Sequence, residues 1–138
     1  KLGARVTLVA PPTLLPAGVE KMGVDKMGVE TTYDLDSVLP QADVLYLLRI
    51  QKERQDRCLI PSIAEYIRCW GVDARRLAKA RRDLLIMHPG PMNVGLEITE
   101  EVATSAGSVI EAQVTNGVAV RMAVLHLLLG GRTNAMAA

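Results

Sequence analysis

The chain has 138 residues, of which 49% are hydrophobic and 22% are charged, with a formal net charge of +1. This composition suits one globular α/β domain or part of a larger protein, and the scattered basic residues argue against a nucleic-acid partner. No apolar run approaches the roughly eighteen residues of a membrane span, so we expect no membrane-spanning segment.

The first half of the chain alternates strand-like and helix-like segments. Residues 1–4 lack the layout of a signal peptide and read as the interior of a longer chain. Residues 5–10 are β-branched and apolar and stop at a proline-rich loop, which predicts a buried strand. A near-repeat, KMGVD followed by KMGVE at 21–30, indicates a local surface duplication without chemistry. Three further elements are predicted: a short strand at 29–33, a short helix at 34–39 with Asp34 as its N-cap, and a buried strand at 43–48.

The second half ends in a long helical pattern. Helices are predicted from Pro61 to about Trp70 and from the N-cap Asp73 to about Ala80, and a strand from Leu84 to Met87. Residues 108–129 then form a helical pattern that ends at two glycines. Its apolar residues are too many for one narrow face, so we expect this helix to need burial on several sides.

This alternation predicts an α/β fold: a Rossmann-like parallel sheet with flanking helices and a long C-terminal helix. Ligands of such sheets bind beyond the carboxyl ends of the strands. Polar clusters follow two predicted strands at such ends, one from Arg49 to Arg54 and one from His88 to Asn93. They are the strongest clue to a site that the residues alone provide.

The cysteines and histidines give no sign of a metal centre. Cys58 and Cys69 lie eleven positions apart without a CxxC motif, which favours two reduced thiols in a cytoplasmic protein. With only His88 and His126 beside them, we expect no zinc site and no bound metal.

Arg49 and Gln51 are candidate substrate-binding residues. Arg49 comes just after a buried strand, where a guanidinium with a fixed backbone can bind a carboxylate of a small anionic ligand bidentately. Gln51 offers a donor and an acceptor on the same side of an extended chain. The alternative is an ordinary solvated loop, because the charged residues that follow look like an exposed helix start.

The sequence HPGP at 88–91 predicts a stiff loop that displays carbonyl oxygens. Pro89 and Pro91 have no N–H, so few backbone donors stand beside those acceptors. Such a row suits a ligand rich in N–H groups, and Gly90 allows close approach to the backbone. The alternative is a stiff turn in which His88 caps the strand. Neither loop contains a nucleophile–base pair, so we expect binding and orientation from these residues.

Four motifs together resemble the aspartate-binding half of the aspartate carbamoyltransferase family, namely APPTLLP, ADVLYLLRIQKER, MHPGPMN and QVTNGVAVRMAVLHLLLG. The resemblance covers nearly the whole chain in the right order. It implies the attack of L-aspartate on carbamoyl phosphate, with no cofactor. It also implies that Arg49 and Gln51 hold the aspartate carboxylates, and that the carbonyls of Pro89 and Gly90 face the carbamoyl nitrogen or the attacking amine.

The resemblance further implies an incomplete enzyme. Residues 1–107 would be a partial aspartate-binding domain that lacks its first strand. Residues 108–138 would be a helix and tail that pack on a missing N-terminal domain, which carries the phosphate-binding loop. No catalytic residue is expected within this chain, the chain alone is expected to be inactive, and the family implies a homotrimer. Val94 departs from the family, which often has an arginine after HPGPMN.

Two alternatives stay open. One is a carboxyl-terminal half of a carbamoyltransferase for another amino acid, in which Arg49 and Gln51 recognise a different substrate. The other is a non-catalytic remnant or an assembly module of a larger pyrimidine enzyme.

Overall fold

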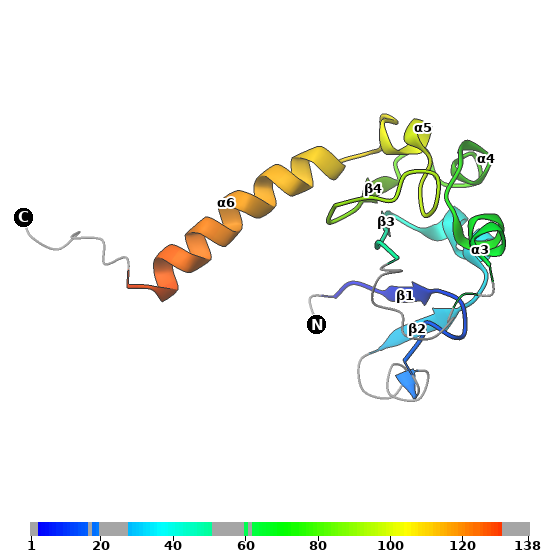
Figure 1. Cartoon of the computed structure of the whole chain (residues 1–138), viewed down its shortest axis with the longest axis horizontal. Helices are drawn as coiled ribbons and strands as arrows, with labels where there is room; N and C mark the ends of the chain where they lie inside the picture. Colours follow the sequence, from blue (N-terminus) through cyan, green and yellow to red (C-terminus); the bar gives the residue numbers. More distant parts are fainter. Residues whose placement is uncertain (1–2, 17, 20–27, 51–59, 61, 131–138) are drawn as a thin grey trace, which may run out of the picture.

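The computed structural model describes residues 3–16, 18–19, 28–50, 60 and 62–130. Short strands alternate with helices there, as predicted (Figure 1). The elements are β1 (Val6–Val9), β2 (Val29–Thr32), α2 (Leu35–Val38), η2 (Leu39–Gln41), β3 (Val44–Tyr46), α3 (Ile63–Trp70), α4 (Ala74–Leu77), β4 (Leu85–Met87), α5 (Glu100–Ala103) and α6 (Ile110–Leu128). None of the helices in these ranges is both long and apolar enough to cross a bilayer.

The predicted N-caps at Asp34 and Asp73 are confirmed. The Asp34 carboxylate accepts from the backbone N–H of Asp36 at 3.0 Å, and the Asp73 carboxylate accepts from that of Arg76 at 2.9 Å. The N-cap of α3 is Ser62, so this helix begins at Ile63 and not at Pro61. The single turn α5 was not predicted, because four residues are too few to establish a helical period.

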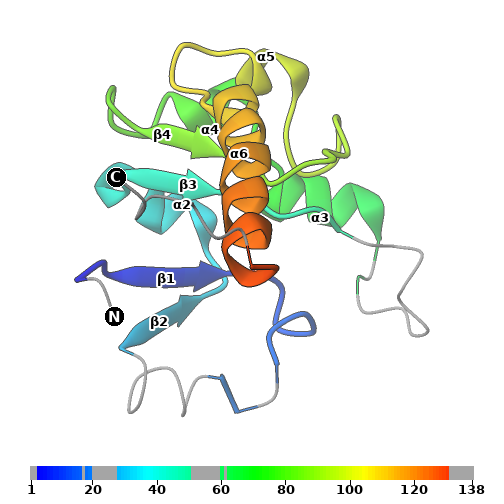
Figure 2. The ribbon, with the colours of Figure 1, turned by 90° about the vertical axis from the view of Figure 1, so that its left-hand side faces the viewer.

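The strands form two parallel pairs. β1 pairs with β2, with Val6 opposite Val29, and β3 pairs with β4, with Val44 opposite Leu85. Figure 2 shows all four strands pointing the same way in the order β4, β3, β1, β2, with a wider gap between β3 and β1 than within either pair. Among the described residues no backbone hydrogen bond joins β1 to β3. The fold is therefore an α/β domain with an interrupted, incomplete parallel sheet.

Only one face of these strands is buried, so the prediction of buried strands is right for one face and wrong for the other. Ile86 is fully buried in a core that also contains Leu35, Leu39, Val72 and Ile98. On the opposite face Val6, Leu8, Val44, Tyr46 and Leu85 are exposed. In Figure 2, α2 and α4 lie behind the strands and leave the front face open beside α6. An apolar run in the sequence could not show that the opposite face has no covering helix among the described residues.

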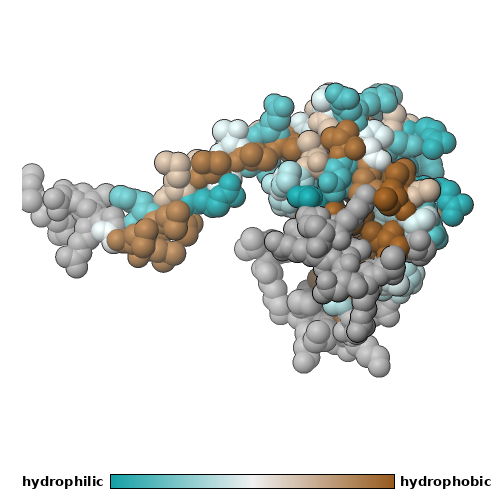
Figure 3. Space-filling model, in the orientation of Figure 1, coloured by the Kyte–Doolittle hydropathy of each residue, from teal (hydrophilic) through white to brown (hydrophobic). Residues whose placement is uncertain are grey.

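Helix α6 projects away from the rest of the molecule (Figure 1). Only Ile110, in its first turn, is buried, and Leu129, just beyond its last turn, is 82% exposed. Figure 3 shows apolar surface along this helix, most continuous toward its carboxyl end. The predicted need for burial on several sides is thus unmet among the described residues.

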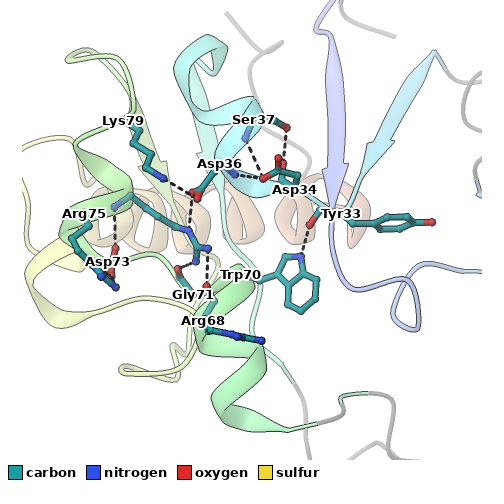
Figure 4. Close-up of polar contacts among 11 residues, drawn as sticks. Tyr33, Asp34, Asp36, Ser37, Arg68, Trp70, Gly71, Asp73, Arg75 and Lys79 are labelled. Atoms are coloured by element: carbon teal, nitrogen blue, oxygen red, sulfur yellow. Dashed lines mark hydrogen bonds and ion pairs between the residues drawn. The ribbon is translucent and has the colours of Figure 1, made fainter.

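Arg76 joins three helices behind the strands. Its guanidinium donates to the carbonyls of Gly71 at 2.5 Å and Arg68 at 2.8 Å, at the end of α3, and to the Asp36 carboxylate at 2.9 Å. Lys79 also donates to Asp36, as Figure 4 shows. Hydrogen bonds from Lys79 and then Arg76 hold the pKa of Asp36 below its usual value. Arg76 therefore caps α3 and fixes it against α2.

We expect Arg76→Met to lower the free energy of unfolding by roughly 2–3 kcal/mol, since two carbonyls and a carboxylate lose a charged donor. The matched control is Arg75→Met, because Arg75 pairs with Asp73 while its side chain is 92% exposed, and we expect less than about 0.5 kcal/mol there. Urea denaturation followed by circular dichroism measures both, and equal losses would contradict the capping role.

Candidate functional site

The two polar clusters predicted from the sequence meet at one edge of the β3–β4 pair. These strands are parallel, with Leu45 opposite Ile86, so their carboxyl ends lie together. The pairing continues past the strands, because the N–H of Leu47 donates to the carbonyl of Met87 at 2.8 Å. Arg49 follows β3, and the segment from His88 to Asn93, here called the acceptor loop, follows β4.

A side-chain hydrogen bond ties the clusters together. The Asn93 side-chain amide donates to the carbonyl of Ile50 at 3.0 Å. Ile50 is buried and fixes the chain immediately after Arg49, which is half-buried. The structure thus brings Arg49, Pro89 and Gly90 to one sheet edge, whereas Gln51 lies outside the described residues.

The acceptor loop turns its N–H groups inward. The N–H of His88 donates to Gln113 Oε1 at 3.0 Å, and the N–H of Gly90 donates to His88 Nδ1 at 2.9 Å. No hydrogen bond from a described residue ends on the carbonyl of Pro89 or Gly90. Gly90 has a φ of +67°, a left-handed conformation that favours glycine. Among the described residues, the carbonyls of Pro89 and Gly90 therefore have no hydrogen-bond donor, and their use by a ligand stays a prediction.

An open hollow of about 440 Å³ adjoins this loop. It lies between the loop residues Gly90, Pro91 and Met92 and the first turns of α6, where Glu111 and Thr115 contribute polar atoms. A larger hollow of about 530 Å³ lies beside α3 and α4, away from the strand ends. Three of its cations, Arg75, Arg76 and Lys79, pair with carboxylates, whereas Arg68 also lines it and is exposed.

A buried ionisable pair lies beneath the acceptor loop. His88 is 0% and Glu97 is 1% exposed, and His88 Nε2 lies 3.4 Å from Glu97 Oε1. The same oxygen accepts the N–H of Asn93 at 2.5 Å. Burial lowers the pKa of His88, and the Glu97 carboxylate only partly offsets that effect. Burial, with the charge of Glu97, also raises the pKa of Tyr66 to about 12.

Sequence reasoning missed Glu97 and Gln113. A signal existed for Glu97, which stands between the apolar residues Leu96 and Ile98 in a segment that is otherwise suited to the core. Gln113 gave no signal, because its contacts with His88 and Tyr46 join residues 25 and 67 positions away. Among the described residues, no group of three or more His, Cys, Asp or Glu side chains is placed to hold a metal ion.

The lowered pKa of His88 predicts a stability change near neutral pH. The unfolded chain protonates His88 below about pH 6.5, whereas the folded chain resists protonation until lower pH. The contribution of neutral His88 to the free energy of unfolding is therefore fully present above about pH 6.5. The free energy of unfolding falls as the pH drops below that value toward the folded-state pKa. Asp36 and Asp73 act separately, because their pKa values are lowered from 3.8 and their contribution is lost only in stronger acid.

Urea denaturation between about pH 5 and 7.5 measures this slope, and we expect it to be smaller in His88→Asn. An unchanged slope in that variant would assign the effect to another group.

Arg49 and the carbonyl oxygens of Pro89 and Gly90 thus lie at one edge of a parallel α/β domain. Residues 1–128 match the family model described as the Asp/Orn binding domain of aspartate/ornithine carbamoyltransferase. The chain therefore belongs to the aspartate/ornithine carbamoyltransferase family, and the predicted resemblance is confirmed.

Relatives with the name "aspartate carbamoyltransferase catalytic subunit" match nearly the whole chain. The one from Nocardioides sp. is 58% identical over 130 residues, covering 94% of this chain and 39% of the relative. The one from Desulfitobacterium hafniense is 54% identical over 132 residues, covering 96% and 41%. The chain thus spans about two fifths of the length of these curated relatives.

Solved structures of the family share the fold. Ornithine carbamoyltransferase from Pyrococcus furiosus has a TM-score of 0.76 at 25% identity, covering 96% of this chain and 44% of that protein. Aspartate transcarbamoylase from Trypanosoma cruzi, solved with carbamoyl phosphate, has a TM-score of 0.69 at 32% identity, covering 87% and 39%. These matches confirm the predicted Rossmann-like class and show that the domain is partial.

Proposed function

We propose that the chain is the aspartate-binding part of an aspartate carbamoyltransferase, which transfers the carbamoyl group of carbamoyl phosphate to L-aspartate in de novo pyrimidine synthesis. The observation that carries the proposal is that Arg49 and the acceptor loop meet at one sheet edge, tied by the bond from Asn93 to Ile50. Relatives at 53–58% identity that bear this enzyme name support it.

In this proposal charge recognition and amide recognition are divided between the two clusters. The Arg49 guanidinium binds a carboxylate of aspartate, and Gln51 adds a second polar contact to the same substrate. The carbonyls of Pro89 and Gly90 accept hydrogen bonds from the carbamoyl nitrogen or the attacking amine. Val94, where the family often has an arginine, is 54% exposed, so this position faces solvent.

The reaction needs no covalent intermediate with these residues. The amino nitrogen of aspartate attacks the carbamoyl carbon, the bond from that carbon to the phosphate oxygen breaks, and phosphate leaves with the bonding electrons. The nitrogen loses a proton as carbamoyl aspartate forms. The contribution of this chain is positioning, which can lower a barrier by several kcal/mol when two substrates are held in reacting geometry. Phosphate binding then belongs to the rest of the enzyme.

Helix α6 and the open face of the strands supply the surface for that remainder. Exposed apolar residues along α6, among them Val118, Met122, Leu125 and Leu128, are far more numerous than a solvated helix needs. We therefore propose that residues 108–138 pack on an N-terminal domain next to the partial domain of residues 1–107. A homotrimeric, cytoplasmic enzyme is the assembly that the family resemblance implies.

The structural similarity to an ornithine carbamoyltransferase makes ornithine a second candidate substrate. The side chain of ornithine carries an ammonium group, which a guanidinium repels, whereas both side-chain and main-chain carboxylates of aspartate attract it. Arg49 at the sheet edge therefore favours a dicarboxylic amino acid.

A hybrid enzyme tests the proposed substrate. It consists of the Nocardioides sp. relative with this chain in place of the matched segment. We expect carbamoyl aspartate from aspartate and little product from ornithine. Arg49→Ala in the hybrid should raise KM for aspartate roughly 100-fold, with a change of less than about threefold for carbamoyl phosphate. Arg82→Ala, which removes an exposed arginine, is the matched control and should leave both constants unchanged. Equal effects of Arg49→Ala on both substrates would contradict the assignment.

The 138-residue chain alone should release no phosphate from carbamoyl phosphate and aspartate, because the proposed phosphate-binding half is supplied by other sequence. A coupled phosphate assay measures this with the hybrid enzyme as its positive control. Turnover by the chain alone would instead place a complete active site within these residues.

A further inference from the structure

We propose that His88 is a positioning residue that aims the Pro89 carbonyl at the substrate, using its Nδ1 atom as an internal acceptor. The inference rests on the proposed function and deepens it, since the sequence suggested no role for His88 beyond capping the strand.

The direction of the Pro89 carbonyl follows from the planar peptide unit between Pro89 and Gly90. The bond from Pro89 to Gly90 is trans, so the carbonyl of Pro89 and the N–H of Gly90 point in opposite directions. The N–H points inward, because it donates to His88 Nδ1 at 2.9 Å. The carbonyl on the other side of the same plane must therefore point outward, away from the imidazole. Without that anchor, rotation of this peptide unit would present a donor where the substrate needs an acceptor.

The imidazole itself is enclosed, with Nδ1 hydrogen-bonded and Nε2 near a carboxylate. Its side chain is fully buried, and its Nε2 faces Glu97 at 3.4 Å. Nδ1 accepts a hydrogen bond, so the proton of the neutral ring lies on Nε2, toward the carboxylate. The ring orientation is thus set before any substrate arrives.

Glu97 extends this arrangement to the Arg49 side of the site. The N–H of Asn93 donates to Glu97 Oε1, and the Asn93 side chain donates to the carbonyl of Ile50. Asn93 therefore connects the acceptor loop to the chain that immediately follows Arg49, and Glu97 holds the backbone of Asn93. Through Asn93, the buried pair helps to fix the separation between the two proposed substrate-binding clusters.

Gln113 supplies a second anchor from α6. Its Oε1 accepts the N–H of His88 at 3.0 Å, and its Nε2 donates to the Tyr46 hydroxyl at 3.0 Å. This side chain connects the start of the acceptor loop to β3. We assign it a positioning role as well, because it holds the backbone from which the His88 ring extends.

Two substitutions separate the Nδ1 contact from the rest of the ring. His88→Asn places Oδ1 near the former Nδ1 position, where it can accept the N–H two residues ahead as in an Asx turn. His88→Gln places its amide nearer the former Nε2 position and loses that contact. In the hybrid enzyme we expect kcat/KM to stay within about fivefold for His88→Asn and to fall by roughly 30-fold or more for His88→Gln. Both remove the imidazole, so their unfolding free energies should differ by no more than the one hydrogen bond to the Gly90 N–H.

Hydrogen exchange of the Gly90 amide reads the contact directly in the 138-residue chain. We expect protection in the unchanged chain and in His88→Asn, and faster exchange in His88→Gln. Equal exchange rates in the two variants, or equal losses of activity in a hybrid that is otherwise active, would overturn the inference. An unsubstituted hybrid that makes no carbamoyl aspartate would instead contradict the proposed function and, with it, the purpose assigned to this contact.

If the His88 variants do not fold, a second pair of variants, at Gln113, tests the same anchoring. Its side chain is half-buried, and Gln113→Glu keeps the oxygen that accepts the N–H of His88 whereas Gln113→Met does not. We expect activity near that of the unsubstituted hybrid in the first variant and roughly a tenfold lower kcat/KM in the second. Equal activity of the two would overturn the anchoring role.

Discussion

The parallel pairing of β3 with β4 is the constraint on which the site depends. It places the chain after Tyr46 beside the chain after Met87, and the hydrogen bond from Leu47 to Met87 carries the alignment one residue further. The pair is held from beneath by Ile86 and Leu84, which are almost completely buried, and burial of one such side chain contributes roughly 1.5–3 kcal/mol. A shift of register by one residue would exchange their buried and exposed faces and separate Arg49 from the acceptor loop.

The strands are uncovered on one face, and their order is interrupted between β3 and β1. Five large apolar side chains of β1, β3 and β4 face outward, and the gap between β1 and β3 interrupts the strand order. Helix α6 leaves the sheet edge with only its first turn buried. Doubly wound sheets normally carry helices on both faces, so the proposed complete enzyme would cover these open surfaces with further structure. The edge with Arg49 and the acceptor loop is nevertheless formed, because its contacts join the segments after β3 and β4 to each other and to the start of α6.

Local signals in the sequence were sufficient for most of the elements, although not for the single turn α5. Short polar residues before apolar segments identified the N-caps Asp34 and Asp73, and polar residues after apolar runs identified two neighbouring strand ends, which the structure brings together. The contacts that orient the site could not be predicted in this way. The bond from Gln113 to Tyr46 and the bond from Asn93 to Ile50 join residues 67 and 43 positions apart, and no local pattern specifies such a pairing. The open strand face was missed for the same reason, since a run of apolar residues records a tendency to be buried and not the presence of a cover.

The chemistry of the acceptor loop also explains why its histidine is buried and neutral. A protonated imidazole has donors at both nitrogens, so it could not accept the N–H of Gly90, and the peptide that carries the Pro89 carbonyl would lose its anchor. Burial disfavours that protonated form, while Glu97 favours keeping the remaining proton on the opposite nitrogen. In the proposed site, the positive charge that a carboxylate requires comes instead from Arg49, on the neighbouring strand end. Under that proposal the charge and the hydrogen-bond acceptors lie on separate segments, so the carboxylate and the nitrogen of an amino acid would bind at one sheet edge without exchanging their partners.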